Sequence, residues 1–384
     1  MKFITLVLLY LFNYSISSKN FKIPYKKMLD SYRINIGLGD PLQSSDVELD
    51  LGIDYMWISN FFYSVDKSFS FSYQQNANFF FFTKTINCQS IQDDIVFSPY
   101  KEKDITVNHF PFYEVNKEDS NGYQSIGLGY NSSLLSQFKN MKLIDKRQFS
   151  FYQINYLDGF ILFGELEEEN KKEYPYKASC SVKNSTWGCQ LSNVLFKQNN
   201  KSIIDYENDN IAFFNSKIHN IKAPKKFIVF LRNHLFNEYI DNRVCNYFQE
   251  SSFENFECTC DIVDKFPDIS LVFDGGVFNI NRNLLFKKIS GICAFNIKNN
   301  NNDDYWEIGS LFIEQYITTF NFDEGQIEFR NKSSFEKYIN RCSLIQKNIL
   351  LIISFTLLIM MPLFITINKE EKHSYNYKKQ YIVV

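Results

Sequence analysis

Short runs rich in Phe, Tyr, Ile and Val recur along most of this chain, and polar or turn residues separate them. No other feature limits the possible folds as strongly. Runs of this length and composition predict β-strands. They lie at residues 68–73, 78–85, 104–108, 149–154, 160–163, 192–197, 211–214, 269–273 and 316–322. Helical periodicity is brief, at 133–139 and 225–239. The pattern predicts an all-β fold with a few short helices.

The composition permits a large core and argues against one class of partner. The chain has 384 residues, 45% of them hydrophobic, and a formal net charge of −2. A protein without excess positive charge has no electrostatic means of binding a polyanion. We therefore expect no nucleic-acid partner.

The first eighteen residues have the features of a secretory signal peptide. Lys2 precedes an apolar stretch at 3–12, and the small residues Ser15, Ser17 and Ser18 follow. This order of a basic, an apolar and a small-residue region is typical of signal peptides. We expect residues 1–18 to be removed and the rest to enter the secretory pathway.

Residues 349–367 are nearly continuous apolar sequence, interrupted by Pro362. About 20 such residues suffice to cross a bilayer, and proline is tolerated in a spanning helix. The segment predicts one C-terminal transmembrane helix. The tail at 368–384 carries four lysines, and basic residues favour the cytoplasmic side. We expect a single-pass type I protein of the secretory pathway or cell surface, with a lumenal or extracellular ectodomain.

Eight cysteines precede the apolar segment, and a secretory location favours disulfides over metal ligands. Cys258 and Cys260 are separated by one residue, which is not the spacing of zinc or redox sites. With four histidines in the chain, we expect no metal and no cofactor. Acceptor motifs for N-glycosylation start at Asn131, Asn184, Asn200 and Asn331, all in the predicted ectodomain.

Two strings place a polar residue directly after an apolar strand. VELDLGIDYMWIS (47–59) brings Asp50 into a turn that contains Gly52, and Trp57 follows seven residues after Asp50. IAFFNSKIHNIKAPKKF (211–227) does the same with Asn215. A hydrophobic-Gly string follows each of them, SIGLGYN (125–131) in one half and YWEIGSLFIEQYITTFNFDEGQIEF (305–329) in the other.

These strings resemble the pepsin-like aspartic proteases. The family's first turn reads hydrophobic-hydrophobic-Asp-Thr-Gly-Ser, and its second has Asp followed by Thr or Ser and Gly, with Pro nine residues after the Asp. Here Asn215 stands at the second Asp, Lys217 replaces the Gly, and Pro224 keeps the frame. In the first turn, Leu51 replaces Thr and Ile53 replaces Ser. The C-terminal string matches the family at Trp306, Gly309, Phe312, Gln315, Tyr316, Phe320 and Gly325.

The resemblance implies a bilobal fold with pseudo-twofold symmetry. It implies β lobes at 31–165 and 173–332, and GFILFGEL (159–166) is similar to the family's interlobe segment. Asp50 and Asn215 would be the dyad positions at the floor of an interlobe cleft. The resemblance also implies a monomeric ectodomain and a disulfide from Cys293 to Cys258 or Cys260. Apart from the resemblance, Cys180 and Cys189 could join the two strands of a hairpin. Gly52, Ser216 and Phe82 are the implied substrate-binding residues.

The family's chemistry requires two carboxylates that share one proton, and an amide at Asn215 cannot replace either. Ser216 keeps one of two hydroxyls that lock the family's turns together, and Leu51 lacks the other. The implied flap at 82–90 has neither Tyr nor Gly. About a dozen residues separate the signal peptide from residue 32, too few for the family's prosegment. We therefore expect an inactive protease homologue that binds peptide or protein in its cleft.

Two alternatives remain open. One is an active aspartic endopeptidase that uses Asp50 with an unconventional partner; Asp205, which also follows two apolar residues, is a weak candidate because it lacks the following Gly. The other is a structural ectodomain of the secretory pathway with no ligand.

Overall fold

The computed structural model describes residues 19–28, 30–81, 84–116, 118, 123–155, 157–166, 175–198, 201–250, 253–300 and 304–332. The predicted signal peptide (1–18), transmembrane segment (349–367) and tail (368–384) lie outside the described residues. Among the helices that are described, none has the length and apolar character needed to cross a membrane. The described residues between 19 and 331 belong to one compact unit, and all that follows concerns this unit.

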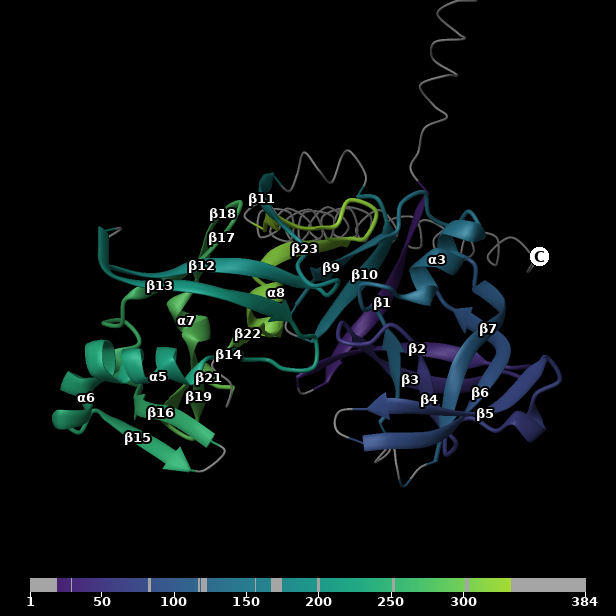
Figure 1. Ribbon diagram of the computed structural model, residues 1–384, viewed down its shortest axis with the longest axis horizontal. Helices are drawn as coiled ribbons and strands as arrows, with labels where there is room; N and C mark the ends of the chain where they lie inside the picture. The colour runs from purple at the N-terminus through teal and green to yellow at the C-terminus, as the bar shows by residue number, and fades with distance from the viewer. Residues whose placement is uncertain are drawn as a thin grey trace, which may run out of the picture. The chain divides into compact units, whose positions relative to one another are not determined.

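The expectation of a predominantly β fold with short helices is confirmed. The largest sheet runs in the order β11-β24-β23-β9-β10-β1-β2-β3-β8-β4-β7-β6-β5 (Figure 1). Its strands are β1 (Asn20–Met28), β2 (Ser31–Leu38), β3 (Gln43–Asp50), β4 (Trp57–Ser59), β5 (Tyr73–Phe81), β6 (Lys84–Phe97), β7 (Ile105–Val115), β8 (Ser125–Gly127), β9 (Gln148–Gln153), β10 (Asp158–Gly164), β11 (Tyr176–Ser181), β23 (Tyr316–Asn321) and β24 (Gln326–Asn331). Strands from both ends of the described chain therefore share one sheet.

Two smaller sheets belong to the second half of the chain. The first has the order β18-β17-β12-β13-β22-β14-β21, and the second has the order β15-β16-β20-β19. Their strands are β12 (Gly188–Gln198), β13 (Lys201–Phe214), β14 (Ile221–Ala223), β15 (Cys245–Glu250), β16 (Phe253–Thr259), β17 (Asp268–Phe273), β18 (Gly276–Ile280), β19 (Phe286–Ile289), β20 (Ile292–Phe295), β21 (Ile297–Asn299) and β22 (Tyr305–Ile308).

The helical segments among the described residues are short. The two longest helical stretches lie at residues 133–140 and 225–241, where the periodicity predicts helices. The segments are η1 (Val65–Lys67), α3 (Ser133–Asn140), α5 (Lys225–Leu231), η2 (Arg232–Phe236), α6 (Asn237–Asp241), η3 (Cys260–Ile262), α7 (Arg282–Leu285) and α8 (Ser310–Ile313). Helix α3 buries Leu134, Leu135 and Phe138 on one face, which is the amphipathic spacing of a surface helix.

The sequence predicts that the first lobe begins at residue 31, and strand β1 lies before that boundary. It pairs antiparallel with β10 along its length and with β2 at its end. Phe21, Ile23 and Tyr25 are buried, and the residues between them are more exposed. This alternation is the pattern of a strand with one face on the core. The sequence predicts the boundary between the lobes at residues 166–172, and of these the structure describes only residue 166.

The prediction of a strand at 68–73 is wrong for most of that run. Strand β5 begins only at Tyr73. Ser70 instead donates a hydrogen bond to Asp93 Oδ1 at 2.5 Å, and the Tyr63 hydroxyl donates to Asp93 Oδ2 at 2.6 Å. The buried Asp93 carboxylate thus holds this segment as a loop, because side-chain hydrogen bonds compete with a strand ladder.

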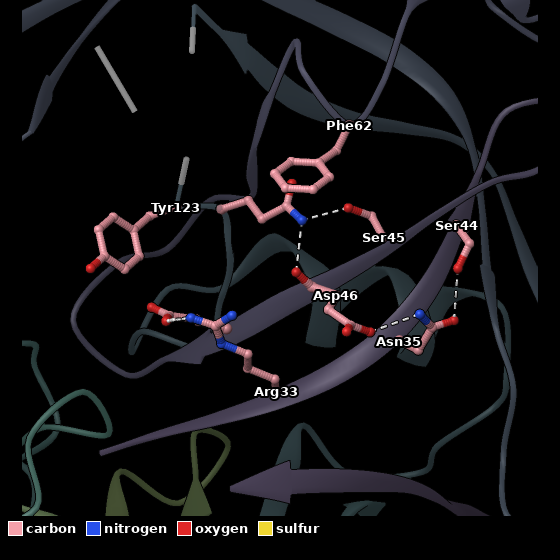
Figure 2. Close-up of a pocket in the computed structure, with 9 residues that line it drawn as sticks. Arg33, Asn35, Ser44, Ser45, Asp46, Phe62 and Tyr123 are labelled. Carbon is pink, nitrogen blue, oxygen red and sulfur yellow. Dashed lines mark hydrogen bonds and ion pairs between the residues drawn. The ribbon is translucent and has the colours of Figure 1, made fainter. Parts of the chain in front are cut away.

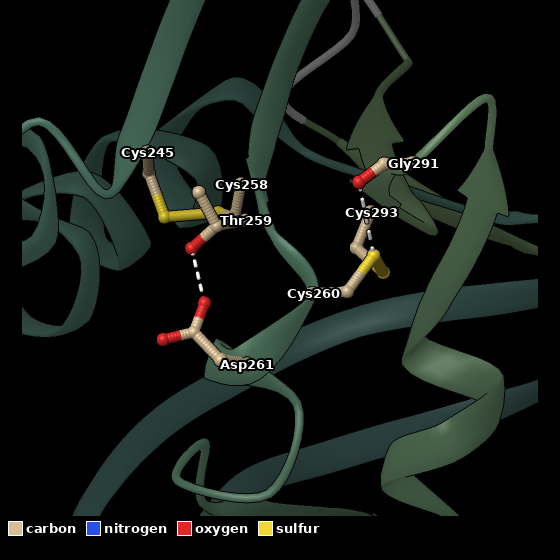
Figure 3. The surroundings of a disulfide bond; sticks show 7 residues. All are labelled: Cys245, Cys258, Thr259, Cys260, Asp261, Gly291 and Cys293. Carbon is tan, nitrogen blue, oxygen red and sulfur yellow. Dashed lines mark hydrogen bonds between the residues drawn. A yellow bond between two sulfur atoms is a disulfide. The ribbon is translucent and has the colours of Figure 1, made fainter.

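Three disulfides are present among the described cysteines. The bond between Cys180 and Cys189 is confirmed, and Cys293 pairs with Cys260 rather than Cys258. Cys258 pairs with Cys245 across β15 and β16 (Figure 3). Two residues that lie two positions apart in a β-strand share a face. Residue 260 has already left the strand for η3, and Cys258 and Cys260 bond to different partners. Cys342 lies outside the described residues.

Candidate functional site

Asp50 is the last residue of β3 and begins a tight turn. Its carboxylate Oδ1 accepts a hydrogen bond from the Gly52 amide at 2.8 Å, and its own carbonyl accepts one from the Leu128 amide at 2.8 Å. Only 4% of the residue is exposed. A Cβ atom at position 52 would lie 3.3 Å from Asp50 Oδ1, so glycine gives the amide its close approach to the carboxylate.

Asn215 follows the last residue of β13 and has the same local arrangement. Its side-chain Oδ1 accepts a hydrogen bond from the Lys217 amide at 2.9 Å. Its backbone amide donates to the Ile308 carbonyl at 2.9 Å. In both turns, therefore, the side chain of one residue holds the amide two residues later, although one side chain is a carboxylate and the other an amide.

The strands beside the two turns repeat the same arrangement. β3 pairs parallel with β8, and β13 pairs parallel with β22. Helix α3 follows β8, and helix α8 follows β22. A Cβ atom on Gly309 would lie 2.2 Å from the Asn220 carbonyl, so α8 begins this close to the second turn only because residue 309 is glycine. The two halves of the chain thus contain the same turn, strand and helix.

Ser216 joins the two turns directly. The Leu51 amide donates to Ser216 Oγ at 3.1 Å, and Ser216 Oγ donates to the Leu49 carbonyl at 2.6 Å. Ser216 is fully buried. Both bonds use the side chain of the second turn and the backbone of the first, because Leu51 has no hydroxyl with which to reach the second turn. Asp50 and Asn215 therefore belong to adjoining turns.

Lys217 forms an ion pair with Asp50 across this junction. Its ammonium group contacts Asp50 Oδ2, with 23% of the lysine side chain and 5% of the aspartate side chain exposed. Asp50 thus has one carboxylate oxygen on the Gly52 amide and the other on an ammonium group.

Glu307 and Lys222 extend the site, and sequence analysis missed both. Asn215 Nδ2 donates to Glu307 Oε2 at 3.3 Å, and Lys222 Nζ lies 3.1 Å from the same oxygen. The string YWEI places Glu307 on β22 opposite Phe213 of β13, one residue before the strand's end. Only that pairing between distant segments brings it to Asn215, so no local signal identifies it.

The remaining candidate residues have varied positions. Phe82 lies outside the described residues, between the end of β5 and the start of β6. Asp205 is exposed on β13, ten positions before Asn215, or about 33 Å along the strand. It therefore cannot serve as a partner for Asp50.

Burial raises the pKa of the Tyr55 phenol, and the nearby Tyr113 and Asp50 raise it further.

The chemistry of the site depends on the polar and charged side chains that the two turns bring together. Within the described part of the chain, no three His, Cys, Asp or Glu side chains gather in a way that could hold a metal ion. At the junction of the turns lie one carboxylate, one carboxamide and one ammonium group. An acid pair depends on a proton that two carboxylates share. Position 215 offers no second carboxylate for such sharing, because its residue is asparagine.

Comparison with known protein families matches residues 31–332 to the family described as eukaryotic aspartyl protease. The match spans most of the chain and both predicted lobes. No curated protein matches the chain.

Proposed function

The chain belongs to the eukaryotic aspartyl protease family, and from this premise we propose that it is a membrane-anchored member without peptidase activity that binds peptide or protein near Asp50. The observation that carries the proposal is the ion pair between Lys217 and Asp50.

The ion pair opposes both proton transfers of acid proteolysis, the one to the general base and the one from the general acid. A general base must hydrogen-bond the water whose proton it takes, and a general acid must hold a proton for the substrate. The Lys217 ammonium occupies Asp50 Oδ2, and the Gly52 amide occupies Oδ1. Asn215 carries no titratable proton, and its own oxygen is engaged by the Lys217 amide. Neither residue is prepared for proton transfer.

Binding without cleavage is supported by the exposure of the same groups. Gly52 is exposed, and Asn215 and Lys217 are half-buried. Polar groups in such positions are available to the carbonyl and amide groups of a peptide. A ligand carbonyl would meet an ammonium group here rather than a shared proton, which favours binding over bond cleavage.

Membrane anchoring is the third part of the proposal. It is supported by the apolar segment at 349–367 and the signal-like residues 1–18. Protease added outside intact vesicles should remove only the tail at 368–384 and leave a glycosylated fragment of ectodomain size. Loss of the ectodomain in this assay would reverse the orientation.

An activity assay on the purified full chain tests the catalytic part. We expect no cleavage of unfolded protein between about pH 3 and 6, where a carboxylate pair shares its proton. Asn215→Asp alone should restore little, because Lys217 would then face two carboxylates and keep both ionised. Asn215→Asp with Lys217→Gly should be needed before any cleavage is detected.

The control for this assay is Asp50→Asn in each background. It should abolish whatever activity the double variant gains. Strong acid proteolysis by the unmodified chain that disappears in Asp50→Asn would overturn the proposal in favour of an active endopeptidase.

A further inference from the structure

A polar pocket of about 320 Å³ lies on the outer face of β2 and β3, upstream of Asp50. The strands are antiparallel, and Arg33 lies opposite Glu48 while Asn35 lies opposite Asp46. Figure 2 shows Arg33, Asn35, Phe62 and Tyr123 around this pocket. It is lined by Arg33, Asn35, Ser44, Ser45, Asp46, Glu48, Phe62, Tyr123 and Gln124.

Most polar atoms of the pocket are engaged with one another. Arg33 forms a 2.7 Å ion pair with Glu48, and Asn35 donates to Asp46 Oδ1 at 2.8 Å. The Gln124 side-chain amide donates to Ser45 Oγ at 2.5 Å and to the Asp46 carbonyl at 2.7 Å. These contacts hold the lining side chains in place.

Two enclosed polar atoms of the pocket have no partner among the described residues. They are the Arg33 Nε–H donor and the Gln124 Oε1 acceptor. Gln124 as a whole is only 4% exposed. A buried donor or acceptor without a partner is unfavourable, so a site that contains one of each favours a ligand that supplies both partners. An amide group is such a ligand.

A third open atom gives the pocket a charge preference. Asp46 is exposed, and no described residue contacts its Oδ2 oxygen by a hydrogen bond or ion pair. Arg33 offsets Glu48, which leaves the Asp46 carboxylate as the uncompensated charge. The pocket therefore disfavours anions, phosphate included, and favours a cationic group at its rim.

Two aromatic rings complete the pocket and account for access to it. Phe62 is 38% exposed and Tyr123 is 54% exposed. Exposed side chains change rotamer readily, on timescales of picoseconds to nanoseconds. Because both rings line the same pocket as Arg33 and Gln124, we take their rotation as the movement that admits a ligand, and the rings would then pack on its apolar parts.

We propose that this pocket binds a short peptide segment with a basic side chain. A backbone carbonyl accepts from Arg33 Nε–H, a backbone amide donates to Gln124 Oε1, and the basic side chain pairs with Asp46 Oδ2. Consecutive peptide units present carbonyls and amides in series, so one segment offers both the acceptor and the donor that the two enclosed atoms lack. The inference does not rest on the proposed function, because none of these atoms belongs to the Asp50 and Asn215 turns.

Calorimetric titration of the full chain with acetyl-Phe-Lys-Gly-amide tests the proposal, with acetyl-Phe-Glu-Gly-amide as the matched probe. We expect the lysine probe to bind and the glutamate probe to bind more weakly. Arg33→Lys keeps a cation beside Glu48 but removes Nε–H, and should weaken the lysine probe roughly ten-fold. Asp46→Asn keeps an acceptor for Asn35, and should weaken the lysine probe roughly two- to five-fold with no loss for the glutamate probe.

Matched variants assign the binding to this pocket. Phe62→Ala should weaken the probe several-fold, whereas Phe69→Ala removes an aromatic ring that is 87% exposed and outside the pocket, and should change nothing. Failure of the lysine probe to bind at millimolar concentration would mean that water alone satisfies the two atoms, and would overturn the proposal. Binding that survives Arg33→Lys and Asp46→Asn but falls in Lys217→Met would place the ligand at Asp50 and would overturn it equally.

Discussion

The hydroxyl of Ser216 lies between the Leu51 amide and the Leu49 carbonyl, 3.1 and 2.6 Å away, and is the direct hydrogen-bonded link between the two turns of the site. All three groups are buried. Since Leu51 has no hydroxyl to return the interaction, Ser216 supplies both of these hydrogen bonds, and the ion pair between Lys217 and Asp50 is a second link between the turns.

Ser216→Ala should lower the free energy of unfolding by about 2–3 kcal/mol, because it leaves a buried amide and a buried carbonyl without partners. Denaturant unfolding of the full chain measures this. The matched control is Ser192→Ala, since Ser192 also donates to a backbone carbonyl, that of Val272, but is exposed. That change should cost no more than about 0.5 kcal/mol. Equal effects of the two substitutions would show that the turns are held by other contacts.

The ion pair between Asp50 and Lys217 should appear as a coupling energy in a double-mutant cycle. Lys217→Met leaves a buried carboxylate without its cation and should cost about 2 kcal/mol, since unpaired buried charge is strongly unfavourable. Asp50→Asn in the same background should recover much of that loss. The control cycle uses Asp261 and Lys265, an exposed pair at i,i+4, for which we expect a much smaller coupling because solvent screens it. Additive effects at Asp50 and Lys217 would rule out a stabilising contact.

Acidification should destabilise the protein through His219. Burial lowers the pKa of His219, and Lys27 lowers it further, with its Nζ 3.3 Å from His219 Nδ1. Glu314 and Asp30 act in the opposite direction, and Lys287 adds to the lowering. The unfolded chain therefore takes up the proton first, and stability falls as the pH drops below about 6.5 toward the folded-state pKa.

His219→Gln should flatten this part of the stability curve, as measured by denaturant unfolding across that pH range. His234→Gln is the matched control, because it removes an exposed imidazole. A proton titration of His219 by NMR should show a midpoint below the ordinary value for histidine. An unchanged slope in His219→Gln would assign the acid sensitivity to other groups.

The disulfides should stabilise the fold in the order of the loops they close. Cys260 and Cys293 are separated by 33 residues, and Cys180 and Cys189 by 9. Loop-closure entropy predicts about 4 kcal/mol for the first and about 3 kcal/mol for the second. Paired Cys→Ala variants, unfolded in denaturant, measure the difference. The reverse order would mean that strain or residual structure in the unfolded chain outweighs loop length.

The sequence by itself determined the features that depend on neighbouring residues. Short runs rich in Phe, Tyr, Ile and Val predict β9, β10 and β17, and the resemblance at Asp50 and Asn215 identifies the two turns and the missing carboxylate. The prediction of a strand in the segment before β5 is wrong, because Asp93, which holds Ser70 in a loop, lies more than twenty positions away in the sequence.

Only the tertiary structure decided what the side chains of the turns contact. The pattern of residues around Lys217 shows that a glycine is absent, but the contact with Asp50 exists because Ser216 fastens the second turn onto the first. In the same way, β22 brings Glu307 to Asn215, and the pairing of β2 with β3 brings Arg33 to Glu48. Periodicity specifies which face of a strand is buried, whereas contacts between distant segments depend on how the strands pair and how the turns pack together.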